Sequence, residues 1–482
     1  MNDVKSKVIS SLAWKFAERI TAQLVTFIVS IVLARLLDPE HYGAIAIVNI
    51  FIALANVFVV SGFGNSLIQK KDSDDTDFSS VFYFNIVMSV VIYIVVFFTA
   101  PLIADFYSMP ILSPTLRVMG LRLIVAGVNS VQHAYVSRHM MFRRFFWSTL
   151  GGTLASAVVG ITMAYHGFGV WALVGQYMTN TITDTIVLWF TVRWRPKLLF
   201  SFKRLGGLFS YGWKILCSAL LETGYTELRS LVIGKVYTSE DLAYYNRGQS
   251  FPHLFVTNIN TSIQSVLFPA MAQEQDKKAR LKNMVRRSIS ISSYVMTPLM
   301  LGLALVAEPL IKILLTEKWL PCVPFLQISC FTYALRPIHT ANLQAIKAMG
   351  RSDIFLKLEI IKKVIGIATL LATMRYGVMA IAISGMITAI LSSVINAWPN
   401  KKLIRYSYFE QIKDLLSPFV ALLFMSVAVV CIGLLNLPLL ADLAIKILLG
   451  AVVYVAVSYF TKNENFTYII NIFKSKFLKI NK

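Results

Sequence analysis

Charged side chains occur inside apolar segments of this chain, where a lipid bilayer would reject them. Eleven such residues are Lys15, Glu18, Arg19, Arg122, Asp184, Lys214, Glu222, Glu227, Arg229, Arg247 and Arg336. An ionised side chain at membrane depth costs a few kcal/mol or more unless it faces a wet cavity or a partner of opposite charge. These positions therefore predict a polar pathway through the interior of a membrane protein.

The first charged segment covers residues 9–36. Lys15, Glu18, Arg19, Ala22 and Thr26 follow one another at short helical steps, which predicts that they share one helical face. Lys15 lies near the end of the segment, where it either faces the pathway or snorkels to the membrane surface. Glu18 either lines the pathway or neutralises Lys15 or Arg19, because intramembrane charges commonly pair.

Two further segments, 207–235 and 239–271, are also polar along one side. Lys214, Glu222 and Arg229 recur at steps of seven or eight residues, and Glu227 lies beside them. Either glutamate can serve to neutralise Arg229. The second segment carries a polar stripe of Gln249, His253, Thr257, Asn260 and Gln264, with Arg247 just before it.

The composition is that of an all-α, polytopic membrane protein. Hydrophobic residues make up 56% of the 482-residue chain and charged residues only 15%, whereas soluble proteins average about 25% charged. About 20 helical residues cross a bilayer, and about fourteen segments are long enough. These spans lie near 9–36, 42–67, 79–105, 114–138, 144–165, 169–193, 207–235, 239–271, 282–308, 320–349, 353–375, 378–403, 411–436 and 438–461.

The connecting segments alternate in charge. Alternate connections, together with both ends of the chain, hold about 30 lysines and arginines, and the opposite set holds five: Arg35, Lys235, Lys312, Lys318 and Arg375. Cytoplasmic loops carry the excess of basic residues, so both termini are predicted to be cytoplasmic. Most of the net charge of +22 then serves topology and contact with anionic membrane lipids, and no nucleic-acid partner is expected.

The span pattern indicates an internal duplication. Trp14 and Trp213 open spans 1 and 7, and from each a step of 21 residues leads to the span end and an acidic loop. We therefore predict two six-helix lobes related by a parallel repeat. The N-lobe covers 1–205 with spans 1–6, the C-lobe covers 206–405 with spans 7–12, and 406–482 holds spans 13 and 14 and a basic cytoplasmic tail.

Prolines predict a mechanical difference between the lobes. Pro252, Pro298 and Pro337 lie inside spans 8, 9 and 10, and a proline removes a backbone donor and can kink its helix. No comparable mid-span proline is expected in spans 1–6. The second lobe is therefore predicted to bend more.

Several short segments resemble the polysaccharide-transporter family, the O-antigen and capsule flippases of the multidrug/oligosaccharidyl-lipid/polysaccharide superfamily. These segments are residues 33–39, 42–43, 141–144, 169–174, 245–247, 267–271 and 317–321. The resemblance runs from about residue 8 to about residue 405. It implies an inner-membrane flippase that moves undecaprenyl-pyrophosphate-linked oligosaccharide repeat units to the periplasmic leaflet, through a cavity bounded mainly by spans 1, 2, 7 and 8.

Arginine suits such a cargo, because a guanidinium can bind pyrophosphate oxygens in a bidentate manner. We expect Arg19 and Arg247 to contact the phosphates first, and Lys15, Lys214 and Arg336 to assist. The expected polar or ion-coupling residues are Glu18, Glu222, Glu227, Asp184, His253 and Asn260. The stripe that includes His253 and Asn260 either joins helices through hydrogen bonds or forms a sugar-binding wall. His133, His253 and His339 either titrate or are hydrogen-bonded packing residues.

Two rival functions differ from the flippase in their requirements. A drug/cation antiporter of the same superfamily would favour an acidic cavity, and a membrane polysaccharide polymerase or ligase would need a sizeable external loop. Asp75 and Asp77 match the DxD pattern of glycosyltransferases, but no nucleotide-binding fold surrounds them. We therefore expect no enzyme activity and no cofactor or metal. Further partners implied by the resemblance are the polysaccharide polymerase and chain-length machinery.

Overall fold

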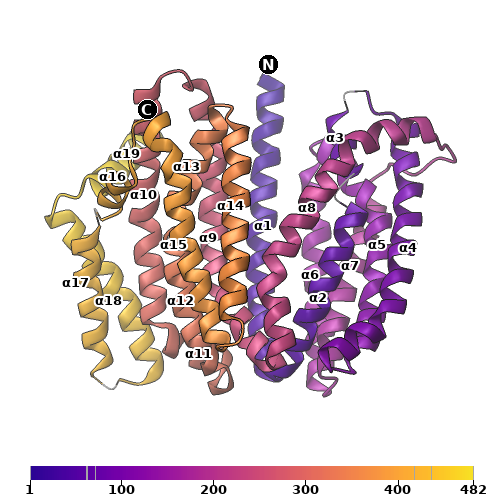
Figure 1. Cartoon of the computed structure of the whole chain (residues 1–482), viewed down its shortest axis with the longest axis horizontal. Helices are drawn as coiled ribbons and strands as arrows, with labels where there is room; N and C mark the ends of the chain where they lie inside the picture. Colours follow the sequence, from indigo (N-terminus) through magenta and orange to yellow (C-terminus); the bar gives the residue numbers. More distant parts are fainter. Residues whose placement is uncertain (1, 61–62, 71, 417, 436, 481–482) are drawn as a thin grey trace. The chain divides into compact units, whose positions relative to one another are not determined.

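The computed structural model describes the backbone of residues 2–60, 63–70, 72–416, 418–435 and 437–480. Within these ranges, side chains are described except for 2–13, 15–17, 63, 65, 69, 210–211, 262, 265–266, 472–473 and 475–480. The described residues form helices joined by short loops, and no β-strand occurs among them (Figure 1). The predicted all-α fold is confirmed. Contacts divide the chain into two compact units, Met1–Ala243 and Tyr244–Lys482.

Eight helices make up the first unit, here called unit 1. In chain order they are α1 (Asn2–Leu36), α2 (Pro39–Val60), α3 (Phe63–Gln69), α4 (Asp75–Tyr107), α5 (Leu112–Arg138), α6 (Phe142–Tyr165), α7 (Val170–Thr191) and α8 (Phe202–Val236). Helix α6 packs on α7 and α1, α5 packs on α4, α2 and α7, and α8 packs on α2, α3 and α4. By its contacts α8 belongs with unit 1, and the predicted division into lobes at residue 205 stays a prediction.

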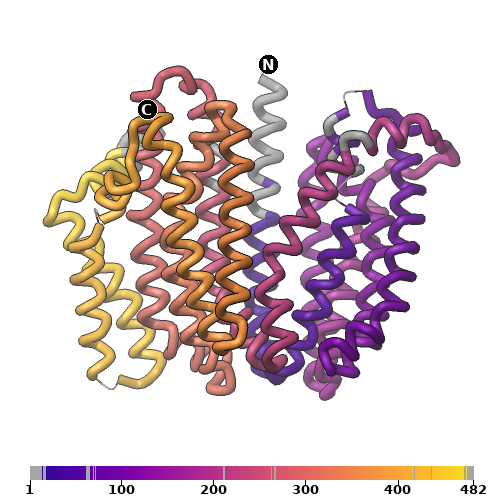
Figure 2. Tube along the Cα trace, viewed as in Figure 1, coloured from indigo at the N-terminus to yellow at the C-terminus, as the bar shows by residue number. Residues whose placement is uncertain are grey.

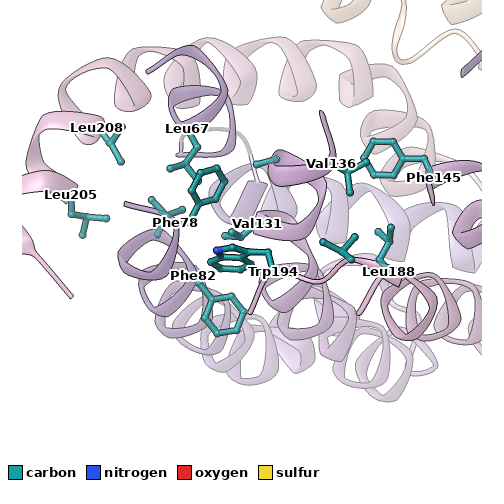
Figure 3. Close-up of a cluster of buried hydrophobic side chains, with 13 residues drawn as sticks. Leu67, Phe78, Phe82, Val131, Val136, Phe145, Leu188, Trp194, Leu205 and Leu208 are labelled. Atoms are coloured by element: carbon teal, nitrogen blue, oxygen red, sulfur yellow. The ribbon is translucent and has the colours of Figure 1, made fainter. Parts of the chain in front are cut away.

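The apolar core of unit 1 joins helices that are far apart in sequence. Leu67 of α3, Phe78 and Phe82 of α4 and Val131 of α5 lie around Trp194, which follows α7 (Figure 3). The Trp194 ring centroid lies 5.7 Å from that of Phe78 and 6.3 Å from that of Phe82. This aromatic group holds the segment between α7 and α8 against α4 and α5.

The acidic residues at the start of α4 have structural partners. Asp74 caps the helix by accepting from the backbone N–H of Asp77, and the Asp77 carboxylate lies 2.6 Å from Lys70 Nζ. Arg204 of α8 pairs with Asp74 at 2.5 Å, and its guanidinium holds the pKa of that exposed carboxyl below the usual value. The two aspartates of the DxD pattern therefore belong to the cap of α4 and to the ion pairs around it.

The second unit, unit 2, contains α9 (Ser239–Gln273), whose first residues belong to unit 1, and the ten helices and one short 3-10 helix that follow. They are α10 (Lys278–Leu305), α11 (Ala307–Leu315), η1 (Glu317–Cys322), α12 (Val323–Ala334), α13 (Arg336–Ala348), α14 (Ser352–Thr373), α15 (Val378–Leu403), α16 (Tyr408–Leu415), α17 (Phe419–Gly433), α18 (Leu439–Phe460) and α19 (Glu464–Ile480). Figure 2 traces their order along the chain.

Several predicted spans are not single helices. Span 10 consists of η1, α12 and α13, and its helix is interrupted at Leu335, two residues before Pro337. Span 13 corresponds to α16 and α17, which are bent by 46° relative to each other. Helices α9 and α10 continue through Pro252 and Pro298. Pro101 lies inside α4 of unit 1, so the expected absence of such a proline from the first lobe is wrong.

A buried group of amides attaches α16 to its neighbours in unit 2. Asn342 of α13 donates to Gln411 Oε1 at 2.7 Å, and Asn400 of α15 donates to Asn342 Oδ1 at 2.6 Å. All three residues are fully buried. Because a buried amide needs a partner, these hydrogen bonds fix the position of the short α16.

Seven of the described helices are long and apolar enough to cross a membrane by length and composition, or eight if the bent pair of α16 and α17 forms one span. One of the seven is the second half of α1, Glu18–Leu36. The other six are the whole helices α2, α4, α6, α10, α15 and α18. The polar helices α5, α7, α8, α9 and α14 have 22 to 35 residues, which also suffices to span a bilayer. The count of about fourteen spans stays a prediction.

One close backbone contact depends on a glycine. A Cβ atom added to Gly43 of α2 would lie 1.9 Å from the carbonyl oxygen of Ser239. That approach is far below van der Waals contact, and backbone atoms have no freedom to withdraw as a flexible side chain would. Residue 43 must therefore be glycine for α2 and the start of α9 to pack in this way.

We predict that Gly43→Ala lowers the stability of the folded chain by at least about 1–3 kcal/mol, the usual cost of overpacking. The matched control is Gly302→Ala in α10, where the added Cβ meets nothing within 4 Å. Alanine there should be neutral or stabilise by roughly 0.5–1 kcal/mol, because glycine weakens a helix. Thermal unfolding in detergent measures both, and equal melting temperatures would contradict the packing argument.

Candidate functional site

The residues selected from sequence fall in both units. Unit 1 holds Glu18 and Arg19 on α1, Asp184 on α7, and Lys214, Glu222 and Glu227 on α8; unit 2 holds Arg247, His253 and Asn260 on α9 and Arg336 on α13. The side chain of Lys15 lies outside the described residues. The other predicted site residues form polar groups within their own unit.

On α1 the predicted polar face is divided. Glu18 is half-buried and accepts a hydrogen bond of 3.1 Å from Thr149 Oγ1 of α6. Trp14, one turn earlier, packs edge-on against Phe146 of the same helix at 5.4 Å between centroids. Arg19 is exposed. Glu18 therefore helps to attach α1 to α6, and Arg19 is the more accessible of the two neighbouring charges.

On α8 the charged residues differ in their surroundings. Lys214 and Glu222 are exposed, whereas Glu227 and Arg229 are half-buried. Glu227 forms no ion pair within 4.0 Å among the side chains that the structure describes. The expected neutralisation of Arg229 by Glu227 is therefore not seen as a direct ion pair.

A hydrogen-bonded group lies between α5 and α7 in unit 1. Asn129 Nδ2 donates to Asp184 Oδ2 at 2.9 Å, and His133 Nε2 lies 3.4 Å from the same oxygen. Phe145 of α6 stacks on the His133 ring at 4.9 Å between centroids. Asp184 thus has partners on the neighbouring helix, of which only His133 can carry a charge.

Further along the same two helices lies Arg122, two turns before Asn129 on α5. Its Nε donates to Thr181 Oγ1 of α7 at 3.0 Å, and its guanidinium carbon lies 5.2 Å from the centroid of the Tyr177 ring. Neither partner carries a negative charge. The guanidinium is therefore held by a hydroxyl and a ring face, an arrangement that a desolvated cation tolerates.

In unit 2, two of the predicted site residues lie near the same aromatic ring. The Arg336 guanidinium carbon is 5.5 Å from the centroid of Tyr333, and the ring of His253 on α9 is 6.1 Å from the same centroid. Arg336 and His253 are both exposed. The structure therefore brings α9 together with the interruption between α12 and α13, and presents an accessible guanidinium there.

Asn260, two turns beyond His253, contacts the neighbouring helix. Thr340 Oγ1 of α13 donates to Asn260 Oδ1. At the preceding residue of α13, His339 Nδ1 lies 3.0 Å from Asn396 Nδ2 of α15. These hydrogen bonds join α9, α13 and α15. Asn260 therefore takes part in helix packing, on the same two helices that carry His253 and Arg336.

Arg247 is held at the beginning of α9. Its guanidinium carbon lies 5.0 Å from the ring centroid of Trp319, a fully buried residue of η1. Gly248 packs so closely that an added Cβ would lie 2.8 Å from the carbonyl oxygen of Cys322. Segments 245–247 and 317–321, both part of the family resemblance, therefore form one packed joint of unit 2.

Sequence reasoning missed three side chains that organise these groups: Asn129, Tyr333 and Trp319. Tyr333 and Arg336 are three residues apart, a spacing that places side chains together on a helix and offered a signal. No comparable local pattern relates Asn129 to Asp184, 55 residues later, or Arg247 to Trp319. Those contacts depend on how the helices pack.

Comparison with known proteins identifies the family. The family model described as "Polysaccharide biosynthesis protein" matches residues 32–324. The chain belongs to the polysaccharide biosynthesis protein family. Among its relatives are lipopolysaccharide biosynthesis protein WzxC of Escherichia coli K12, 24% identical with 86% of this chain and 85% of that protein covered, and succinoglycan biosynthesis transport protein ExoT of Rhizobium meliloti 1021, 22% identical with 75% and 73% covered.

Solved structures support the fold of this family member. The inward closed conformation of the lipid II flippase MurJ aligns with a TM-score of 0.74 at 15% identity, covering 94% of this chain and 99% of that one. An inward-facing multidrug resistance MATE transporter of the MOP superfamily aligns with a TM-score of 0.64 at 15% identity, covering 80% and 96%. The chain therefore has the fold that these two solved transporters share.

We predict that Arg247 and Trp319 are energetically coupled. A double-mutant cycle with Arg247→Met and Trp319→Leu should give a coupling free energy of roughly 0.5–2 kcal/mol, the range of partly desolvated cation–π pairs. Thermal unfolding of the four proteins measures it, and Arg375→Met, an exposed arginine, is the control for losing a charge. Strictly additive effects would show that the ring contact contributes nothing.

Proposed function

We propose that this chain is a flippase that moves undecaprenyl-pyrophosphate-linked oligosaccharide repeat units from the cytoplasmic to the periplasmic leaflet by alternating access, for O-antigen, capsule or exopolysaccharide synthesis. Membership of the polysaccharide biosynthesis family over residues 32–324 carries this proposal. Relatives named for lipopolysaccharide biosynthesis and succinoglycan transport and the fold shared with a lipid II flippase support it.

The charges within the helices favour an anionic cargo. Of the eleven charged residues in the apolar segments, seven are lysine or arginine. A guanidinium pairs with phosphate through two parallel hydrogen bonds, and the attraction is stronger in a site with little water. We assign the first contacts with pyrophosphate to Arg19 and Arg247, with Lys15, Lys214 and Arg336 assisting.

Arg336 has the surroundings that such a contact needs. Its guanidinium is exposed and lies over the Tyr333 ring, so the ring restrains the arginine without neutralising it. A sugar next to the phosphate can stack on an aromatic face or accept hydrogen bonds, and His253 offers a polar group beside the same ring. We therefore propose that Arg336, Tyr333 and His253 supply an assisting contact for the lipid head in unit 2.

The cellular setting follows from the charge of the loops. The chain is a multi-pass membrane protein, and we propose that it lies in the bacterial cytoplasmic membrane with both termini in the cytoplasm. The contrast of about 30 basic residues against five between alternate loops supports that orientation. Membrane lipids are then its constant neighbours, and we propose the polysaccharide polymerase and chain-length machinery as later partners.

Two alternatives predict other activities. A drug/cation antiporter is compatible with the fold, which is shared with a MATE transporter, but the charges inside the helices are mostly basic. A polysaccharide polymerase or ligase needs a sizeable external domain, and the described loops are short. Efflux of a cationic dye without lipid flipping would favour the first alternative, and lengthening of a lipid-linked glycan would favour the second.

We predict that Arg336→Ala slows flipping of a fluorescent undecaprenyl-pyrophosphate oligosaccharide in proteoliposomes by about tenfold or more. The loss of one charge-assisted hydrogen bond of about 1.5–3 kcal/mol corresponds to about tenfold to 150-fold. Arg336→Lys should retain part of the rate, because it keeps the charge but not the fork. The rate of reagent access to the labelled lipid measures the effect.

Arg19→Ala and Arg247→Ala test the first contacts in the same assay. The control is Arg375→Ala, which removes an exposed positive charge from the loop after α14. Comparable slowing by Arg375→Ala would indicate a general effect of charge. Unaltered flipping by both Arg19→Ala and Arg247→Ala would overturn their assignment to pyrophosphate, whatever the outcome for Arg336.

A further inference from the structure

The connection between α7 and α8 in unit 1 presents four large apolar side chains outward. Their exposed fractions are 95% for Leu198, 42% for Leu199, 44% for Phe200 and 80% for Phe202. The rings of Phe200 and Phe202 pack edge to face, with 4.7 Å between their centroids. Residues 198–202 are here called the apolar loop. A contiguous apolar surface of this kind marks a site of interaction with another molecule or with a membrane.

Hydrogen bonds tie the backbone of the apolar loop to α4. The N–H of Lys197 donates to Ser79 Oγ and that of Ser201 to Ser80 Oγ, both at 3.0 Å. Just before the loop, the side chain of Trp194 is buried in the core of unit 1 (Figure 3). The apolar side chains are therefore turned outward while the backbone on both sides of them is attached to the fold.

The two serines set the depth of the apolar loop relative to a bilayer. Helix α4 is long and apolar enough to cross a membrane. Its 33 residues extend about 50 Å, whereas the hydrocarbon core is about 30 Å thick, so roughly 10 Å at each end lie among the headgroups. Ser79 and Ser80 lie about 6–8 Å along the helix from its first residue, Asp75. The apolar loop is therefore level with the headgroups, close to the hydrocarbon.

Five basic residues surround the apolar loop, and they divide into two groups. Three hold the connection through hydrogen bonds or ion pairs: Arg195 at the end of α7, Lys197 with Asp75, and Arg204 with Asp74. Arg193 and Lys203 are exposed, and neither forms an ion pair within 4.0 Å among the side chains that the structure describes. These two charges flank the loop and stay available to an anionic partner.

Apolar side chains at headgroup depth, flanked by basic residues, suit the surface of an anionic membrane. Aromatic rings are favoured at this level of a bilayer, and the anionic lipids of the cytoplasmic leaflet attract nearby lysines and arginines. The connection belongs to the basic set of loops, which are predicted to be cytoplasmic. Depth, apolar exposure and charge therefore agree on the same partner.

We propose that the apolar loop, Arg193 and Lys203 bind anionic lipids of the cytoplasmic leaflet. Leu198 and Phe202 insert among the upper parts of the acyl chains, while the guanidinium and the ammonium group contact lipid phosphates. The site holds the cytoplasmic ends of α4 and α8 at a fixed depth in the bilayer. Its ligand is the lipid of the leaflet rather than a transported cargo, so this site is independent of the flippase function.

Spin labels can measure the depth of the apolar loop in the full-length chain, because its cysteines differ in exposure. Only Cys217 and Cys431 are exposed, and alanine at both positions leaves the buried Cys322 and Cys330 in place. This parent chain should take up no label. Each cysteine introduced into it then reports on one chosen position.

The first test compares nitroxides at Leu198→Cys and Phe202→Cys with one at Asp72→Cys, an exposed polar position before α4. The vesicles contain equal amounts of phosphatidylglycerol and phosphatidylethanolamine. We expect oxygen, which concentrates in the bilayer, to relax the first two labels more than a water-soluble nickel chelate does, and the reverse at residue 72. Nickel access in the loop equal to that at residue 72 would overturn the proposal. Shielding from both reagents would also overturn it, since a protein surface would then cover the loop.

The second test measures the choice of lipid. A bimane at Phe202→Cys is quenched by phosphatidylglycerol or phosphatidylcholine with a nitroxide on the acyl chain, and the ratio of the two efficiencies gives the preference for anionic lipid. Arg193→Gln with Lys203→Gln should lower this preference by up to about fivefold for each charge. The matched control, Lys401→Gln with Lys402→Gln, removes two exposed charges from the end of α15 and should leave the preference unchanged. Equal effects of the two pairs, or no effect of the first, would overturn the proposal.

Discussion

The cost of removing a charge from water governs this structure. Each ionisable group within an apolar helix needs a partner that costs less than the bilayer. Asp184 is met by an amide and an imidazole, and Arg122 by a hydroxyl and a ring face. In α18, Lys446 and Asp442 pair at 2.7 Å with side chains only 12% and 13% exposed. The contacts of Asp184 and Arg122 join α5 to α7, so these charges contribute to helix packing.

In unit 2, two basic residues are accompanied by aromatic rings. Arg247 and Arg336 both lie over aromatic rings, those of Trp319 and Tyr333. A ring face attracts a cation without cancelling its charge. The Arg336 guanidinium therefore keeps its capacity to bind an anion, which a carboxylate partner would have used. The fully buried Trp319 instead links Arg247 to the stability of the joint between η1 and α9.

Much of the fold was predictable because its signals are local. Apolar length located the helices α4, α5, α6, α7, α15 and α18 to within a few residues, and short family segments indicated the correct family. The interruption at Leu335 and the separate α11 and α19 were missed, since they depend on turn geometry rather than on hydropathy. The partners of Asp184 were not predictable, because Asn129 and His133 meet it only through the packing of α5 on α7. The pathway residues themselves stay predictions.

The contact at Gly43 restricts the amino acid at residue 43 but not the one at residue 239. Its partner is the backbone of Ser239 rather than the side chain, and every amino acid supplies the same carbonyl oxygen. Residue 239 can therefore change over generations without a compensating change at residue 43, which must itself stay glycine. Methods that infer proximity from correlated substitutions will find no pair here, although the two backbones touch.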